Sequence, residues 1–265
     1  MRVRIRFSKT GPIRYVGHLD FMRTFQKAVK KSGLAAVYSA GFNPHMLISF
    51  AAPLGVGEET TGDYADVDFA YRDPAELTEH EAYRLTHMEL DQDTLPNPPY
   101  SEEMTAILSA AMPPGVTVND TVRVGLTKDS KAMALVRNAS WELILSDEAA
   151  AQLPAEELQN GLEAFMARES IIVRKKTKKS EKDVDIRPLI GKLALKEAEE
   201  DGSRKLVVCI TCATGSMENL KPVVILQAVS EQLELAHSLA EGVLIRRTEI
   251  YDEEMRPLSA LGTRI

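Results

Sequence analysis

The chain opens with the stretch Met1-Arg-Val-Arg-Ile-Arg-Phe7, in which arginine alternates with apolar side chains. Because successive side chains of a β-strand point to opposite faces of a sheet, this alternation predicts a strand that buries Val3, Ile5 and Phe7. The other face of the strand carries a row of arginines. Gly11 and Pro12 then end the strand.

A helix over residues 18–32 is predicted next. Its core face is formed by apolar residues at helical spacing, namely Leu19, Met22, Phe25 (or Gln26) and Val29. Basic residues recur beside that face at i, i+4, i+7 and i+8, namely Arg23, Lys27, Lys30 and Lys31. Gly33 is a candidate C-cap. The sequence therefore places a basic stripe on the helix that follows the arginine row.

Along the whole chain, the sequence predicts the same order of elements twice: strand, helix, strand, strand, helix, strand. In the first half these elements fall at residues 1–7, 18–32, 47–52, 63–71, 101–112 and 116–126. In the second half they fall at residues 133–145, 154–168, 171–176, 205–211, 220–239 and 243–251. The βαββαβ order is that of the ferredoxin-like fold. We therefore expect an α+β protein made of two tandem ferredoxin-like modules, residues 1–130 and 131–265.

Charge is unevenly distributed along the chain. The first fifty residues carry nine basic side chains and one acidic one, whereas the whole chain has a net charge of -7. Such segregation favours an anionic partner, and a basic stripe on one face is typical of nucleic-acid binding. The predicted RNA-binding residues of this half are Arg2, Arg4, Arg6, Lys9, Arg14, Arg23, Lys27, Lys30 and Lys31. Such residues follow a phosphate backbone without selecting a sequence, so binding should weaken steeply with salt. A plain solvated face is the alternative.

A second basic run leads out of a predicted strand in the other half of the chain. Its members are Arg174, Lys175, Lys176, Lys178 and Lys179. We expect this run to contribute to the same RNA surface. A solvated loop is the alternative interpretation.

The segment Gly41-Phe-Asn-Pro-His45 combines a permissive glycine, an aromatic residue and a rigid turn. Phe42 is suited to stacking on a base and Asn43 to hydrogen-bonding one, as in single-stranded RNA recognition. Read as structure alone, the segment is a corner between two strands.

Three residues near loop or helix ends are candidates for catalysis: His18, Asp20 and His45. Histidine and aspartate serve as general bases or metal ligands. The alternative is that Asp20 stabilises a helix N-terminus and His18 occupies an N-cap position. Nothing in their spacing forces the three side chains together, so no metal site is predicted.

Composition excludes several classes of protein. No run approaches the roughly 18 apolar residues of a membrane span, and the N-terminus lacks the apolar region of a secretory signal, so we expect a cytoplasmic protein. Cys209 and Cys212 are too few for a disulfide framework or a cysteine-held cofactor. Within a strand, residues three apart point to opposite faces, which argues against a redox or metal role for the pair. Trp141, flanked by apolar residues, is predicted to be core.

Several motifs resemble the radical-SAM-linked protein family, a domain of unknown function found alone or behind B12-binding radical SAM domains. The matching stretches are Arg6-Phe-Ser-Lys-Thr-Gly11, Arg14-Tyr-Val-Gly-His-Leu-Asp20, Gly41-Phe-Asn-Pro-His45, residues 48–57, Gly62-Asp-Tyr64, residues 174–188, and Ile245-Arg-Arg-Thr248 with Tyr251. The resemblance implies an accessory to a separately encoded B12-binding radical SAM enzyme. This chain lacks the cysteine triad that holds the radical SAM cluster, so it cannot hold that cluster itself.

Three functions remain open. The first is a non-enzymatic protein that presents a structured RNA, ribosomal or transfer RNA, to a radical SAM enzyme. The second is an endoribonuclease or RNA-modifying enzyme that uses His18 and His45 as acid and base near Arg14. The third is a protein-interaction module whose basic face docks an acidic enzyme surface without RNA.

Overall fold

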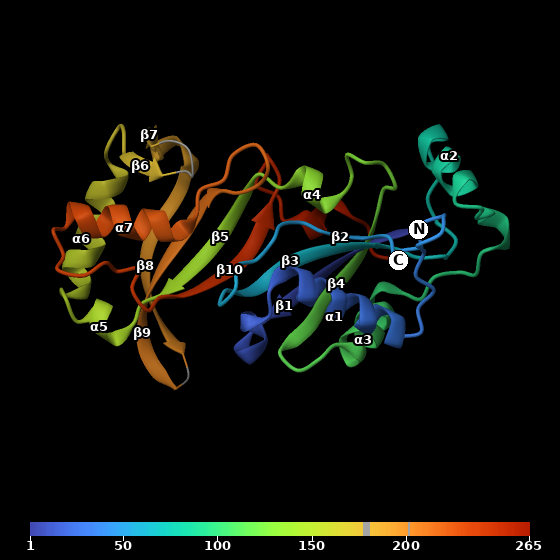
Figure 1. The fold of residues 1–265 in the computed structure, drawn as a ribbon, viewed down its shortest axis with the longest axis horizontal. Coiled ribbons are helices and arrows are strands. Elements are labelled where there is room, and N and C mark those ends of the chain that lie inside the picture. The colour runs from blue at the N-terminus through green and yellow to red at the C-terminus, as the bar shows by residue number, and fades with distance from the viewer. Residues whose placement is uncertain (177–180, 201) are drawn as a thin grey trace. The chain divides into compact units, whose positions relative to one another are not determined.

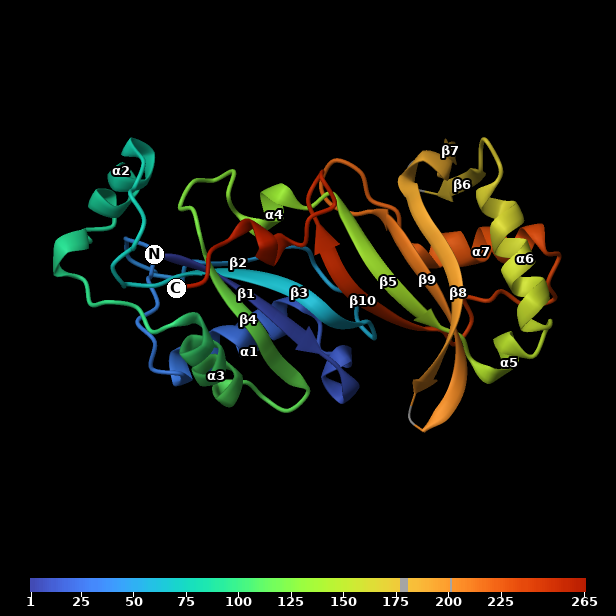
Figure 2. The same ribbon diagram turned by 180° about the vertical axis from the view of Figure 1, so that it is seen from behind.

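A computed structural model describes residues 1–176, 181–200 and 202–265. The chain forms two compact units, one of Met1–Val136 with Glu249–Ile265 and one of Arg137–Thr248. Both units combine helices with antiparallel sheet, which agrees with the predicted α+β class (Figure 1, Figure 2). The predicted modules were continuous in sequence and met near residue 130. In the structure, residues 249–265 instead belong to the first unit.

Unit 1 is built around strand β1. Its elements are β1 (Arg2–Lys9), η1 (Gly11–Tyr15), α1 (His18–Lys31), β2 (Ile48–Phe50), β3 (Glu59–Asp68), α2 (Glu79–His87), η2 (Gln92–Thr94), α3 (Ser101–Ala111), β4 (Val116–Val124), α4 (Ala132–Leu135) and η4 (Leu258–Leu261). β1 pairs antiparallel with both β3 and β4, and β2 pairs with β3. Both hydrogen-bonding edges of β1 are therefore paired, and the side chains on both of its faces are largely buried.

The apolar face of β1 forms the core of unit 1, as predicted. Val3, Ile5 and Phe7 are at most 1% exposed and belong to one apolar cluster with residues of α1 and α3. Phe7 lies 5.2 Å from Phe25 of α1, measured between ring centroids. Each buried aromatic residue removes a large apolar area from water, so these contacts fix α1 on the sheet.

The predicted core face of α1 is partly wrong. Leu19 is 63% exposed, and the helix instead buries Phe21, Phe25, Ala28 and Val29. These four residues also follow helical spacing, at i, i+4, i+7 and i+8. The aromatic pair provides more buried area than Leu19 and Met22, so the helix turns its phenylalanines inward and leaves Leu19 in solvent.

Unit 2 contains most of the elements predicted for the second half of the chain. Its elements are β5 (Asn138–Ile144), α5 (Asp147–Ala150), α6 (Ala155–Met166), β6 (Ile172–Lys176), β7 (Glu181–Asp185), η3 (Arg187–Leu189), β8 (Ile190–Glu200), β9 (Ser203–Ala213), α7 (Pro222–Gln232) and β10 (Leu244–Tyr251), the last three residues of β10 belonging to unit 1. β9 pairs antiparallel with β5 and with β8. Trp141 of β5 is buried, as predicted.

Two strands of unit 2, β7 and β8, were not predicted from sequence. Residues 171–176 were expected to pair in the main sheet, but β6 pairs only with β7 in a separate two-stranded ribbon. The strand in the main sheet is β8, whose Ala-, Lys- and Glu-rich sequence is typical of helices. Pairing with β9 along its length overrides that local preference.

Candidate functional site

The arginine row of β1 is not an exposed surface. Arg2 and Arg4 are each 1% exposed, so the prediction that they contact RNA is wrong in this fold. The Nε atom of Arg2 lies 2.7 Å from Asp68, and the Nε atom of Arg4 lies 2.8 Å from Asp66. The strand register sets these partners directly opposite each other on β1 and β3. Each pair has the two-pronged geometry that arginine makes with a carboxylate.

The buried pairs also hold the segment that covers this face of the sheet. Arg4 donates hydrogen bonds to the carbonyl oxygens of Leu258, at 3.0 Å, and Ser130, at 2.6 Å. The backbone amide of Ala132 donates to Asp66 at 2.6 Å. The row therefore joins β1 and β3 to residues 130–132 and to η4, which is a structural role.

The third arginine of the row is half-buried in a cluster of its own. The guanidinium of Arg6 lies 3.1 Å from Glu249, and the hydroxyl of Tyr64 donates to the same carboxylate at 2.5 Å. Burial, helped by the negative charge of Glu249, raises the pKa of Tyr64 far above its usual value. Arg6 is therefore already paired with a carboxylate, and a phosphate would have to compete with Glu249 for it.

Lys9 is also buried, at 2% exposed, so it does not form part of an RNA surface. Its ammonium donates to the carbonyl oxygen of Val16 at 2.9 Å and lies 5.0 Å from the ring centroid of Phe21. Burial lowers the pKa of Lys9, although the carboxylates of Asp63 and Glu58 oppose that shift. The side chain thus ties the loop after η1 to the end of β1.

Arg14 lies in η1, just before that loop, and is partly accessible. Its guanidinium lies 3.0 Å from Glu59 and 3.2 Å from the hydroxyl of Tyr15. η1 also contacts the segment before β3, because the amide of Gly57 donates to the carbonyl oxygen of Arg14 at 2.9 Å. Tyr15 itself is 63% exposed, which places an aromatic ring in solvent beside a cation.

The basic stripe of α1 is exposed, as its spacing predicts. Its members are Arg23, Lys27, Lys30 and Lys31. Asp20 is the only acidic residue of α1 and forms an exposed ion pair with Arg23 at 3.0 Å. Among the described residues, no acidic side chain forms an ion pair with Lys27, Lys30 or Lys31. The stripe is therefore one part of the predicted RNA surface that remains accessible.

The segment Gly41–His45 forms the tip of a hairpin beside β3. Tyr38 and Met46 pair across the hairpin, and the amide of Ser39 donates to the carbonyl oxygen of His45 at 2.9 Å. Phe42 at the tip is 105% exposed relative to its reference state, and Asn43 is also exposed. The ring of Phe42 is therefore not buried against the rest of the chain, and its position adds no hydrophobic stabilisation to the fold. We take Phe42 as a candidate contact residue for that reason.

The two candidate catalytic histidines have separate surroundings. The ring of His18 lies 5.6 Å from that of Phe50 at an interplanar angle of 83°, a T-shaped packing contact. The Nδ1 atom of His45 is 2.8 Å from the hydroxyl of Ser39. Asp20 pairs with Arg23 near the start of α1. No contact among the described residues joins the two imidazoles, and no group of three His, Cys, Asp or Glu side chains there is arranged to hold a metal ion.

The second predicted basic run is only partly described. Arg174 is exposed and pairs with Asp183 across the β6–β7 ribbon at 3.4 Å. Lys178 and Lys179, together with the side chains of Lys175 and Lys176, lie outside the described residues. The run's proposed contact with RNA therefore stays a prediction.

The two cysteines lie on β9 and have raised pKa values. Burial raises the pKa of the Cys212 thiol to about 12, and burial also raises that of Cys209. The deprotonated thiolate, and not the neutral thiol, is the form that reacts and binds metals. Because a raised pKa keeps both cysteines protonated at neutral pH, they are poorly suited to redox chemistry there.

The residues that sequence reasoning missed are Asp66 and Asp68 of β3. Their pattern was visible in Tyr64-Ala-Asp-Val-Asp68, where polar and apolar residues alternate as they do in β1. Two alternating strands that both bury their apolar face bring their polar rows side by side if they pair. The sequence alone does not show that β1 and β3 are neighbours.

A comparison with known protein families shows to which family the chain belongs. Residues 2–88 and 84–222 match a family described as an uncharacterized protein conserved in bacteria, DUF2344. The chain belongs to this family. A comparison with curated proteins gives no match. The DUF2344 match includes the buried arginine row, the α1 stripe and the start of α7, and its description names no activity. None of the described helices of this DUF2344 protein is long and apolar enough to cross a membrane.

Proposed function

We propose that the protein binds structured RNA, ribosomal or transfer RNA, through the exposed face of α1. The observation that carries the proposal is the set of four exposed cations on this helix beside a single acidic residue, Asp20. The rise from Arg23 to Lys31 is about 12 Å. Along the axis of a B-form duplex each strand carries one phosphate per about 3.4 Å, so this length corresponds to three or four phosphates of one strand.

Two exposed aromatic residues support RNA over a simple anion. Tyr15 lies one turn before α1 with the Arg14 guanidinium 5.0 Å from its ring centroid, and Phe42 is fully exposed at the hairpin tip. Unpaired RNA bases stack on such rings, and each stack contributes about 1–3 kcal/mol. Phosphate contacts from α1 and base stacking on Tyr15 and Phe42 would together favour loops or single-stranded segments of a folded RNA.

The test is fluorescence anisotropy of labelled transfer RNA with the full chain at several salt concentrations. We expect the logarithm of the binding constant to fall with the logarithm of salt with a slope of about -3, because four cations release counterions. The double variant Lys27→Glu/Lys30→Glu should abolish binding at moderate salt. Binding that is unchanged in this variant would overturn the proposal.

A matched control lies in the same unit on the other side of the sheet. Lys128 is exposed in the loop whose carbonyl oxygens accept hydrogen bonds from Arg2, which faces away from α1. Lys128→Glu changes the net charge by the same amount as Lys27→Glu or Lys30→Glu alone. We expect it to leave transfer RNA binding nearly unchanged; an equal loss would mean that net charge, rather than the stripe, controls binding.

A second candidate function is protein interaction, and exposed apolar residues favour it. Tyr15, Leu19 and Val56 are 63%, 63% and 68% exposed, and the loops that carry Tyr15 and Val56 are hydrogen-bonded to each other. Exposed apolar residues close together are typical of protein contacts. Binding of a partner protein that persists in high salt without RNA would favour this function. The endoribonuclease hypothesis has less support, because His18 packs against Phe50 and His45 bonds Ser39.

The resemblance noted in the sequence supplies a partner for either function. We propose that the chain is an accessory to a separately encoded B12-binding radical SAM enzyme. We also infer that both units are ferredoxin-like modules, in support of which the strands follow the order β4-β1-β3, with β2 on β3, in unit 1 and the order β10-β5-β9-β8 in unit 2. Co-purification of the two proteins, with and without ribonuclease treatment, distinguishes an RNA-dependent association from a direct one.

A further inference from the structure

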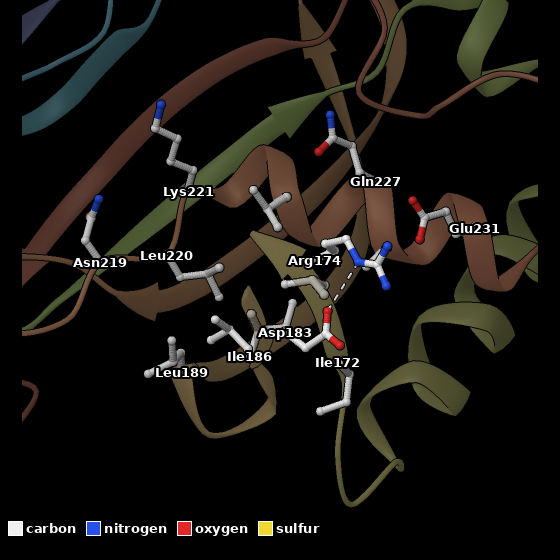
Figure 3. Close-up of a pocket in the computed structure, with 14 residues that line it drawn as sticks. Ile172, Arg174, Asp183, Ile186, Leu189, Asn219, Leu220, Lys221, Gln227 and Glu231 are labelled. Atoms are coloured by element: carbon white, nitrogen blue, oxygen red, sulfur yellow. Dashed lines mark hydrogen bonds and ion pairs between the residues drawn. The ribbon is translucent and has the colours of Figure 1, made fainter. Parts of the chain in front are cut away.

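Unit 2 contains a groove that the proposed RNA surface does not use. It has a volume of about 650 Å³ and lies between the β6–β7 ribbon, η3 and α7 (Figure 3). This volume is within the range of about 300–1,000 Å³ that is typical of ligand sites.

The walls of the groove are aliphatic. The apolar lining residues are Ile172, Val173, Val184, Ile186, Leu189, Leu220, Val224 and Ala228. Ile172 is 58% exposed although it is a large apolar residue on a strand. Aliphatic surface of this kind is stabilised by an apolar occupant, and the lining contains no aromatic ring on which a base would stack.

Charged residues are placed at the two ends of the groove. Lys221, Val224, Ala228 and Glu231 follow one face of α7 at spacings of three and four residues, so Lys221 and Glu231 are separated by a helical rise of about 15 Å. Among the described residues, neither Lys221 nor Glu231 forms an ion pair. The helix dipole adds positive potential near Lys221 and negative potential near Glu231, which reinforces the polarity.

The remaining polar lining residues do not cancel this polarity. Arg174 is paired with Asp183 within the ribbon, as the dashed line in Figure 3 marks, so this pair adds no net charge. Gln227 lies between the two charged ends of the groove and offers both a donor and an acceptor. The groove thus combines aliphatic walls, the amide of Gln227 near its centre, and opposite charges at its two ends.

We propose that this groove binds an extended peptide segment of a partner protein, with an aliphatic centre, an acidic residue at Lys221 and a basic residue at Glu231. An extended chain advances about 3.3 Å per residue, so four or five residues span the two charges. The Gln227 amide suits the main chain of such a segment. The site belongs to unit 2 and is independent of RNA binding by α1.

The test is titration of the ¹⁵N-labelled full chain with three synthetic peptides, followed by NMR of the Val224 and Ala228 amides. The mixed peptide is acetyl-Glu-Leu-Val-Leu-Lys-amide, and the other two carry Glu or Lys at both ends. We expect the mixed peptide to bind about threefold more tightly than either of the others, as an exposed ion pair typically contributes. Because a short peptide binds in either direction, the variants below change the protein charges one at a time.

Charge substitutions should switch the preference. Lys221→Glu makes both ends acidic and should favour the peptide with two lysines, whereas Glu231→Lys should favour the peptide with two glutamates. Glu148→Lys, at an exposed position of α5 outside the groove, should keep the wild-type order. Ala228→Arg should abolish the shifts of Val224 by filling the groove. Absence of any peptide-induced shift in the wild type, or an order of affinities that is the same in the wild type and in both charge variants of the groove, would overturn the proposal.

Discussion

The buried Arg4–Asp66 pair should be far more important for stability than an exposed pair of the same two residue types. Asp66→Ala removes a carboxylate whose side chain is 1% exposed and leaves the Arg4 guanidinium buried without its counter-charge. The Asp20–Arg23 pair is a matched control, because its side chains are 70% and 71% exposed.

The size of the effect follows from the contacts that are lost. Asp66 accepts hydrogen bonds from Arg4 at 2.8 and 3.1 Å and from the Ala132 amide at 2.6 Å. Hydrogen bonds to charged groups contribute about 1.5–3 kcal/mol each, but part of this is recovered when water reaches the vacated space. Breaking a buried pair by removing one partner typically costs about 3–5 kcal/mol, which we expect for Asp66→Ala. Asp20→Ala should cost about 0.5 kcal/mol or less.

Native-state hydrogen exchange of the β1 and β3 amides measures the free energy of opening of unit 1 directly. We expect the most protected of these amides to lose about 3–5 kcal/mol of protection in Asp66→Ala. The double variant Arg4→Met/Asp66→Leu should be more stable than Asp66→Ala, because no unpaired charge remains buried. It should still be less stable than the wild type, since the carbonyl oxygens of Leu258 and Ser130 lose their donor.

A double variant Arg4→Met/Asp66→Leu that is no more stable than Asp66→Ala would refute this reasoning. Equal losses for Asp66→Ala and Asp20→Ala would refute it as well, because burial would then make no difference to the pair.

Three further predictions concern stability and reactivity. Hydrogen bonds from Thr78 and from the Leu126 amide outweigh the effect of burial and hold the pKa of Glu81 below its ordinary value of 4.5. Glu81→Gln should therefore lower stability at neutral pH, and its difference from the wild type should vanish as pH falls through the lowered pKa, which acid titration of unfolding measures. Gly115→Ala should destabilise by more than 1 kcal/mol in urea unfolding, because φ is +85° and the new Cβ would lie 2.5 Å from a backbone oxygen; Gly33→Ala, with φ of +78° and open space, should cost only about 1 kcal/mol. Cys212 should resist iodoacetamide at pH 8 in the folded protein and react on unfolding, as mass spectrometry of labelled peptides would show, and rapid native labelling would contradict its burial.

Local periodicity was sufficient to predict β1, the basic stripe and the α+β class. It failed for β8, because the Ala-, Lys- and Glu-rich segment 190–200 has a helical composition and becomes a strand only through its pairing with β9. It also misassigned the core face of α1, since two sets of apolar residues follow helical spacing and only packing against Phe7 and Phe50 selects Phe21 and Phe25.

The alternation of arginine with apolar residues in β1 and the excess of positive charge in the first fifty residues are visible in the amino-acid sequence. Which of those charges are accessible depends on how the strands pair in three dimensions. The register of β1 against β3 places Arg2 opposite Asp68 and Arg4 opposite Asp66, so that two cations become internal ion pairs. A charge that is removed from water requires a counter-charge at close range, and that counter-charge comes from a strand more than fifty residues away in the sequence. In the stripe on α1, Arg23 forms an exposed ion pair with Asp20, no described carboxylate pairs with Lys27, Lys30 or Lys31, and all four cations remain in solvent.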